Sequence, residues 1–297
     1  MGPATLCIAF FTLGAAVDIG GTLSPTFRTK IMNYGSRNET SSPAAAQERP
    51  TSMFGKLFDT VASMQVPHSW FIHYYIVSGI SSLFWGYQIF TGGKVFQFLV
   101  SYTDQSTSGM TFNQVVLAWT FMTTQGTRRL YECVTLTKPS QSRMWIGLWA
   151  IGMLYYVFMG ISVWIEGTAA LNHQGHSLEI SWPSMRSSIA TVIFAVASLS
   201  QHGCHVYLAS LKKYTLPDRG LFGLVVCPHY TCECLVYIAI AVVAAPKDRV
   251  LNTTVLSGLG FVVTNLAVTA DSTLEWYAEK FGADKVRGRK RMVPFLF

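Results

Sequence analysis

Charged residues are scarce in this chain of 297 residues, of which they make up 12%, whereas hydrophobic residues make up 50%. The mean hydropathy is +0.33. Soluble globular proteins carry about 25% charged residues, so the composition argues against a water-soluble enzyme. The values lie between those of a soluble enzyme and those of a pure transporter core, and they indicate a polytopic membrane protein.

The glycine fingerprint of soluble dinucleotide-binding domains is also missing. That fingerprint needs its glycines between a strand and a helix, but Gly258-Leu259-Gly260 lies inside an apolar stretch. The chain shows no internal repeat of the kind that builds many transporters. A soluble-type cofactor domain is therefore excluded.

The six cysteines do not form a disulfide framework, because all of them lie in or beside apolar segments. They are Cys7, Cys133, Cys204, Cys227, Cys232 and Cys234. His229 is close in sequence to the last two, but helix residues two apart point in different directions and do not easily share one ion. We therefore expect packed, reduced thiols and no bound metal.

Seven apolar runs approach the roughly 20 residues that a helix needs to cross a bilayer. The sequence therefore predicts an all-α protein, a polytopic membrane bundle of about seven transmembrane helices. The predicted spans are residues 3–20, 69–90, 111–124, 144–165, 188–211, 222–245 and 250–270. The first run lacks a basic leader and a small-residue cleavage site, so we expect it to be retained as a span.

Basic residues near span ends favour the cytosolic side of a membrane. With a cytosolic carboxy-terminal tail, all 22 Lys and Arg residues except Lys94, Arg186, Lys247 and Arg249 fall on that side. The amino terminus is then lumenal or extracellular. The net charge of +7 is scattered over separate loops without a binding motif, which argues for anionic lipid headgroups and against nucleic acid as a partner.

Glu233 is the only charged residue in the apolar stretch 222–245. A carboxylate in the middle of a bilayer costs about 2.5 to 3.5 kcal/mol on insertion scales, so it is expected to be paired or to face a cavity. Pro228 can open a helix here, and its free backbone donors favour an anion. On that helix Tyr230 and Glu233 share a face, with Tyr237 one turn further on.

Further polar residues cluster at the predicted cytosolic ends of the spans. The clusters are 125–132 (QGTRRLYE), 201–205 (QHGCH) followed by Lys212 and Lys213, 214–219 (YTLPDR) and the basic tail. Together with Glu233 they predict a wall that binds phosphate and ribose. The alternative is an interhelical hydrogen-bond network that stabilises the bundle.

Four motifs resemble those of the steroid 5α-reductase family. Residues 220–233 (GLFGLVVCPHYTCE) are similar to its G-x-F-x-x-V-x-x-P-N-Y-x-x-E motif, and 287–297 (RGRKRMVPFLF) to its K-x-R-K-A-x-x-P-F-x-F ending. Residues 128–133 (RRLYEC) and 204–211 (CHVYLASL) resemble the R-R-L-x-E-C and C-H-x-x-L-x-x-L stretches of its polyprenol reductase branch. The resemblance covers about residues 65–297.

The resemblance implies a seven-helix membrane bundle that binds NADPH from the cytosol and saturates a carbon–carbon double bond conjugated to a carbonyl. Nine cofactor residues are carried over from the family by position, and Tyr230 is added because it shares the predicted wall with Glu233. The predicted cofactor residues are Arg129, Gln201, His205, Lys212, Tyr214, His229, Tyr230, Glu233, Tyr277 and Arg289.

Several positions depart from the family pattern. Gln201 and His229 replace Asn, and His205 replaces Asp, but all three side chains can hydrogen-bond an amide, a ribose or a phosphate. Thr273 and Leu274 stand where the family has histidines. Val66 and Gly126 stand where it has the Glu and Tyr that bind a steroid carbonyl, which weakens the case for a steroid substrate.

The branch implies a long-chain isoprenoid substrate in the endoplasmic reticulum membrane, with a cytosolic carboxy terminus. Hydride adds readily to an enal but not to an isolated alkene, so the aldehyde polyprenal is favoured over the alcohol, on the route to dolichol and protein N-glycosylation. The candidate catalytic donors to its oxygen are His73, Tyr74 and Glu132, the last kept protonated by burial. The predicted path of the lipid tail is lined by Trp70, Phe71, Tyr75, Phe84 and Trp85.

The predicted organisation is a first span with a flexible cytosolic loop (residues 1–64), followed by the reductase domain (65–297), whose part from about 200 to 297 binds NADPH. No obligate protein partner is evident. The alternatives are a 3-oxo-steroid 5α-reductase, an isoprenylcysteine-type methyltransferase, and a non-catalytic membrane lipid carrier. A methyltransferase would differ from a reductase in its preferred cofactor. A carrier would differ from both in having no affinity for a nucleotide.

Overall fold

The computed structural model describes residues 1–24, 27, 53–104, 109–138, 140–172, 183–212 and 214–297. The predicted flexible loop at 34–50 lies outside these residues. The described chain is predominantly helical, as predicted. Its helices are α1 (Pro3–Thr22), α3 (Met53–Ser63), α4 (Ile72–Thr91), α5 (Lys94–Val100), α6 (Phe112–Thr135), α7 (Ile146–Ser162), α8 (Thr168–Asn172), α9 (Met185–Ser210), α10 (Pro228–Val243), α11 (Thr253–Phe281) and α12 (Ala283–Val286).

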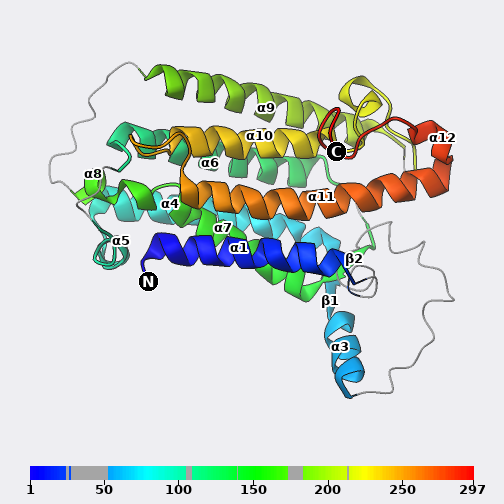
Figure 1. Ribbon diagram of the computed structural model, residues 1–297, viewed down its shortest axis with the longest axis horizontal. Coiled ribbons are helices and arrows are strands. Elements are labelled where there is room, and N and C mark those ends of the chain that lie inside the picture. The colour runs from blue at the N-terminus through cyan, green and yellow to red at the C-terminus, as the bar shows by residue number, and fades with distance from the viewer. Residues whose placement is uncertain (25–26, 28–52, 105–108, 139, 173–182, 213) are drawn as a thin grey trace.

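The long helices lie side by side in one bundle (Figure 1). α9 packs along α10, α1 along α11, and α4 against both α6 and α7. α10 lies inside the bundle, where Tyr237, Ile240 and Val243 are buried. Phe121 of α6 stacks on Phe194 of α9 with ring centroids 4.1 Å apart. The interior is thus built from apolar and aromatic side chains of several helices.

Four helical stretches are long and apolar enough to cross a membrane by length and composition: α1, Ile146–Asn172, α9 and α11. The sequence predicts seven. Among the other three predicted spans, α10 is apolar but has only 16 residues, α4 has three buried serines, and α6 ends in a polar segment.

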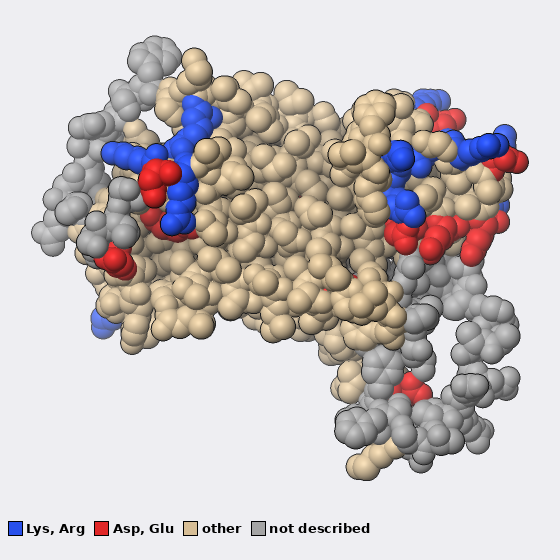
Figure 2. Space-filling view, viewed as in Figure 1, with Lys and Arg blue, Asp and Glu red and all other residues tan. Residues whose placement is uncertain are grey.

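The surface supports a membrane location. On the face shown in Figure 2, the Lys, Arg, Asp and Glu side chains gather at the two ends of the molecule, and the band between them is almost without charge. Several exposed side chains of α9 are large and apolar, including Ile189, Val192 and Leu199. Such a band suits contact with lipid tails.

The third predicted span is wrong at its end, because the helix does not stop at residue 124. α6 continues to Thr135 and carries the polar segment 125–132 in its last turns. It begins with a capping box between Thr111 and Gln114. The Gln114 amide also donates to the carbonyl oxygens of Val243 and Ala245, at 2.9 and 2.8 Å, and so satisfies the end of α10.

A short antiparallel ladder is not predicted from the sequence. β1 (Gln65–Pro67) pairs with β2 (Arg143–Trp145), with Val66 opposite Met144. The ladder lies at the end of the bundle where α4 and α7 begin (Figure 1). It therefore fixes the starts of these two helices next to each other.

The carboxy-terminal tail packs against the start of α10. The backbone N–H groups of Val226 and Cys227 donate to the carbonyl oxygens of Lys290 and Arg291, at 2.8 and 2.9 Å. The Thr231 hydroxyl donates to the carbonyl of the buried Met292. Two of the segments that carry the family resemblance, far apart in sequence, are therefore in direct contact.

Candidate active site

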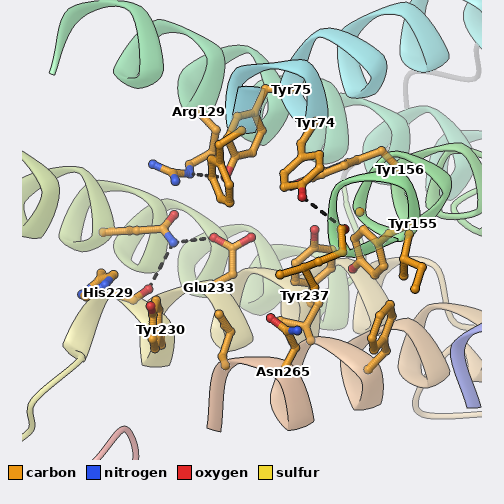
Figure 3. Close-up of a pocket in the computed structure, with 18 of the residues that line it drawn as sticks. Tyr74, Tyr75, Arg129, Tyr155, Tyr156, His229, Tyr230, Glu233, Tyr237 and Asn265 are labelled. Atoms are coloured by element: carbon orange, nitrogen blue, oxygen red, sulfur yellow. Dashed lines mark hydrogen bonds between the residues drawn. The ribbon is translucent and has the colours of Figure 1, made fainter. Parts of the chain in front are cut away.

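A cavity of about 180 Å³ lies between α4, α6, α7, α9, α10 and α11 (Figure 3). Two sets of side chains line it. One set, here called the polar wall, comprises Arg129, Gln201, His205, His229, Tyr230 and Glu233. The other, here called the tyrosine cluster, comprises Tyr74, Tyr75, Tyr155, Tyr156 and Tyr237. Six of the ten predicted cofactor residues therefore meet at one cavity.

Glu233 is paired, as its position in an apolar stretch predicts. Its Oε2 atom accepts a hydrogen bond from Gln125 Nε2 at 3.0 Å and another from Gln201 Nε2. The same Gln201 nitrogen donates to the backbone carbonyl of His229 at 3.1 Å. Side chains from α6, α9 and α10 thus hold the carboxylate on the cavity wall. α10 begins at Pro228, which confirms the predicted helix start.

The two adjacent arginines of α6 both donate to Glu132 and differ in their other hydrogen-bond partners. Arg128 donates to Glu132, to Gln201 and, at 2.7 Å, to Gln125 Oε1. Arg129 donates to Glu132, and through Nε to the Tyr75 hydroxyl at 3.1 Å. Both guanidinium groups are thereby oriented by side chains of neighbouring helices.

Glu132 is surrounded by donors and is only 2% exposed. Besides the two arginines, His202 Nδ1 lies 2.8 Å and His205 Nδ1 lies 2.7 Å from its carboxylate oxygens. Two guanidinium groups at a carboxylate favour its ionised form. This setting argues against the predicted protonated donor, and it connects Glu132 to Arg129 and His205 of the polar wall.

Glu132 lines a second hollow, a groove of about 610 Å³ next to the cavity. Phe71, Arg129 and His205 line both. In the groove, Lys138 Nζ donates to the backbone carbonyl of Leu211 at 2.7 Å. Two residues of the polar wall, Arg129 and His205, therefore line both the cavity and a larger groove that also contains Lys138.

His229 presents an unused polar atom. Its ring lies between those of Tyr230 and His205, with centroid distances of 4.3 and 5.5 Å. Its Nδ1 atom is buried and has no hydrogen-bond partner among the described residues. A buried polar atom without a partner costs about 1–3 kcal/mol, so this atom suits a ligand.

The remaining four predicted cofactor residues lie outside the cavity lining, and Tyr214 and Tyr277 lie at the end of α11. Lys280 Nζ lies 3.9 Å from the Tyr214 ring centroid. Arg289 donates to the Pro217 carbonyl at 2.6 Å. Tyr277 packs in the same apolar cluster as Tyr230 of the polar wall. Lys212 is exposed.

The predicted catalytic donors differ in position. His73 does not line the cavity, and its Nδ1 accepts a hydrogen bond from the Trp149 indole at 3.3 Å. Tyr74 lines the cavity, but its hydroxyl donates to the backbone carbonyl of Leu148 at 3.2 Å. With Glu132 in the groove, only Tyr74 of the three faces the cavity.

The residues predicted to line a lipid path are also divided. Phe71 and Tyr75 line the cavity. Trp85 packs in the core, with its ring centroid 4.9 Å from that of Trp164. Phe84 is exposed, and Trp70 contacts Trp149 with centroids 5.1 Å apart.

Sequence reasoning missed three cavity residues, Tyr155, Tyr156 and Asn265. Gln125, which belongs to the predicted polar cluster 125–132, supports Glu233. Asn265 is a polar residue within an apolar span, so the argument that identifies Glu233 could have found it. Tyr155 and Tyr156 lie in the middle of the predicted span 144–165, and none of the motifs identified in the sequence includes them.

The described residues contain no group of three or more His, Cys, Asp or Glu side chains placed to hold a metal ion. The six cysteines are free.

Comparison with known proteins gives a consistent set of relatives. Residues 142–297 match the family described as 3-oxo-5-alpha-steroid 4-dehydrogenase. Polyprenal reductase 2 of Oryza sativa subsp. japonica is 27% identical over 350 residues, which cover 99% of this chain and 94% of the relative. Polyprenal reductase of Xenopus laevis is 28% identical, covering 68% and 65%, and that of Saccharomyces cerevisiae 32% identical, covering 57% and 60%.

Proposed function

Because this chain belongs to the 3-oxo-5-alpha-steroid 4-dehydrogenase family, the steroid 5α-reductases, we propose that it is an NADPH-dependent reductase of polyprenal. It saturates the double bond next to the aldehyde, in the synthesis of dolichol for protein N-glycosylation. The observation that carries the proposal is the single cavity in which the polar wall meets the tyrosine cluster (Figure 3).

The polar wall fits a dinucleotide. Arg129 and His205 can donate to phosphate, and Glu233 can accept from ribose hydroxyls or a carboxamide. The unpartnered Nδ1 of His229 supplies one further polar contact in the same wall. When bound, NADPH supplies a hydride and leaves as NADP⁺. The residues near the end of α11, including Tyr214 and Arg289, are proposed to contact the parts of NADPH that extend beyond the cavity.

The reduction begins with addition of hydride to the β carbon of the enal. The electrons of the carbon–carbon double bond move toward the aldehyde, and negative charge develops on its oxygen. A proton from water then adds to the α carbon, which gives the saturated aldehyde. The protein contributes orientation and a hydrogen bond to the developing oxyanion.

A steroid substrate is less well supported. The position where the family has a carbonyl-binding Tyr is Gly126, and a Cβ atom there would meet Ser78 Oγ at 2.5 Å. α4 and α6 therefore approach too closely for a larger side chain at this position. The apolar part of the cavity lining, which includes Ile151, Phe261 and Leu266, suits an isoprenoid.

We further propose that the chain crosses the endoplasmic reticulum membrane seven times, through α1, α4, α6, α7, α9, α10 and α11, with a cytosolic carboxy terminus. The end of α9, the start of α10 and the carboxy-terminal tail lie at one end of the bundle, together with β1 and β2 (Figure 1). This arrangement agrees with the predicted cytosolic position of most basic residues.

The test is to supply the purified full-length protein in lipid with NADPH and, in separate reactions, polyprenal, polyprenol and a 3-oxo-Δ4 steroid. Mass spectrometry would show a gain of two hydrogens on polyprenal, and deuterium from labelled NADPH would appear at the β carbon. Turnover of the steroid alone would overturn the proposal. Methyl transfer from S-adenosylmethionine, or isoprenoid binding without nucleotide affinity, would support the alternative enzyme or the carrier.

A further inference from the structure

The Tyr155 hydroxyl is a buried polar group without a hydrogen bond. Tyr155 is 6% exposed and lines the cavity. Its oxygen has no hydrogen-bond partner of suitable geometry among the described residues. The Tyr237 hydroxyl is a polar neighbour close enough to interact with it. Leaving such a group unpaired costs about 1–3 kcal/mol, which a ligand acceptor would recover.

The three residues predicted as catalytic donors are engaged elsewhere or lie outside the cavity. Tyr74 donates to the Leu148 carbonyl. Glu132 accepts from two arginines, and His73 lies outside the lining. Tyr155 is therefore better placed than any of the predicted catalytic residues to donate to a substrate oxygen.

The ring of Tyr155 is fixed by aromatic neighbours. Its centroid lies 5.3 Å from that of Tyr156, 5.4 Å from Phe11, 5.9 Å from Phe261 and 6.0 Å from Tyr237, all in edge-to-face contact. A donor fixed in this way loses little rotational freedom when it meets its acceptor. That is the property required of a group that stabilises developing charge.

The position of Tyr155 along the cavity also fits. In Figure 3, His229 and Tyr230 lie on one side of the cavity, Tyr155 and Tyr156 on the other, and Glu233 between them. Ile151 and Phe261 line the same cavity with apolar surface. An isoprenoid aldehyde between the polar wall and the tyrosine cluster therefore has the proposed dinucleotide wall and a hydroxyl donor in the lining of the same cavity.

We propose that Tyr155 is a catalytic residue whose hydroxyl donates a hydrogen bond to the aldehyde oxygen of the substrate; this inference rests on the proposed function. Hydride addition breaks the π bond between the α and β carbons and transfers two electrons to the substrate. The resulting negative charge on oxygen strengthens the hydrogen bond from Tyr155. The O–H bond of Tyr155 does not break, because the proton for the α carbon comes from water.

The first test is Tyr155→Phe, which keeps the ring and its four aromatic contacts and removes only the oxygen. Loss of one such donor lowers kcat by roughly 100- to 1,000-fold. We expect this loss for polyprenal, with NADPH affinity unchanged and thermal stability no lower, since the removed hydroxyl has no hydrogen-bond partner among the described residues. Tyr87→Phe is the matched control, because Tyr87 is exposed on α4 and outside the cavity.

The second readout is the carbonyl stretching frequency of a short-chain polyprenal, labelled at its aldehyde carbon and bound with NADP⁺ so that it is not reduced. The wild-type protein should lower this frequency, and Tyr155→Phe should restore it. If the wild type turns over polyprenal, an unchanged rate and an unchanged frequency in Tyr155→Phe would overturn the assignment. Loss of the rate and of the frequency shift in Tyr156→Phe but not in Tyr155→Phe would overturn it too. Absence of NADPH-dependent reduction by the wild type would instead refute the proposed function.

Discussion

Gln125 donates a 3.0 Å hydrogen bond to Glu233, which lies 108 residues further along the chain. The Gln125 side-chain oxygen accepts from Arg128, and its nitrogen also donates to Gln201. One buried amide thus connects the charged groups of α6 with the carboxylate of α10. Orientation of Glu233 depends on residues that lie beyond the cavity as well as on its own helix.

Replacing Glu233 with Gln should weaken NADPH binding. The substitution removes the negative charge. In one of its two orientations, the new amide also turns its NH₂ group toward the donors of Gln125 and Gln201. Hydrogen bonds to charged groups contribute about 1.5–3 kcal/mol, so we expect a rise in the dissociation constant of roughly 10- to 100-fold, measured by fluorescence titration. Asp248→Asn, an exposed change outside the cavity, is the control. Unchanged affinity in Glu233→Gln would remove that residue from the cofactor site.

Replacing Gln125 with Leu should destabilise the fold. The change removes one buried hydrogen-bond partner from each of Arg128, Gln201 and Glu233, at a cost of about 1–3 kcal/mol. The expected result is a lower midpoint of thermal unfolding in detergent. Thr120→Ala tests an exposed position of the same helix and should change stability by no more than about 0.5 kcal/mol. Equal midpoints for the two variants would contradict a structural role for Gln125.

Replacing Met292 with Ala should loosen the carboxy-terminal tail. Met292 is 2% exposed and packs with Val226, Cys227 and Ala270. Large-to-small changes in a core cost about 2–5 kcal/mol. Faster proteolysis of the tail, detected by mass spectrometry, is the expected result. Leu296→Ala, at a position that is 80% exposed, is the matched control and should leave the cleavage rate unchanged.

The proposed topology predicts opposite protection of two sites in sealed endoplasmic reticulum vesicles. A protease added outside should remove an epitope tag fused to the carboxy terminus. It should not cleave a protease site inserted after Lys247, in the connection between α10 and α11, until detergent opens the vesicles. Protection of the carboxy-terminal tag would require the reverse orientation.

The position of Glu233 could be predicted because one charge within an apolar stretch has few acceptable environments. The start of α10 at Pro228 could be predicted because proline suits the first turn of a helix. Both conclusions use local properties of the chain, which the sequence displays directly.

Other features depend on tertiary contacts that the sequence does not display. Hydropathy ends the third span at residue 124, but the polar end of α6 remains helical because its side chains pair with those of α9 and α10. The aromatic contacts of Tyr155 come from α1, α7, α10 and α11. Burial of Glu132 suggested a protonated acid, whereas its pairing with two arginines favours a carboxylate. In each case, contacts with residues distant in sequence determine the structure or the charge state.

The ladder between β1 and β2 ties the beginning of α4 to that of α7 through backbone hydrogen bonds alone. From Pro67, a fixed number of residues leads to Tyr74, whose hydroxyl meets the Leu148 carbonyl. One inserted residue would turn every side chain of α4 by about 100° around the helix axis, although the ladder itself could still form. Among homologous chains, the length of this connection should therefore vary less than its amino-acid composition.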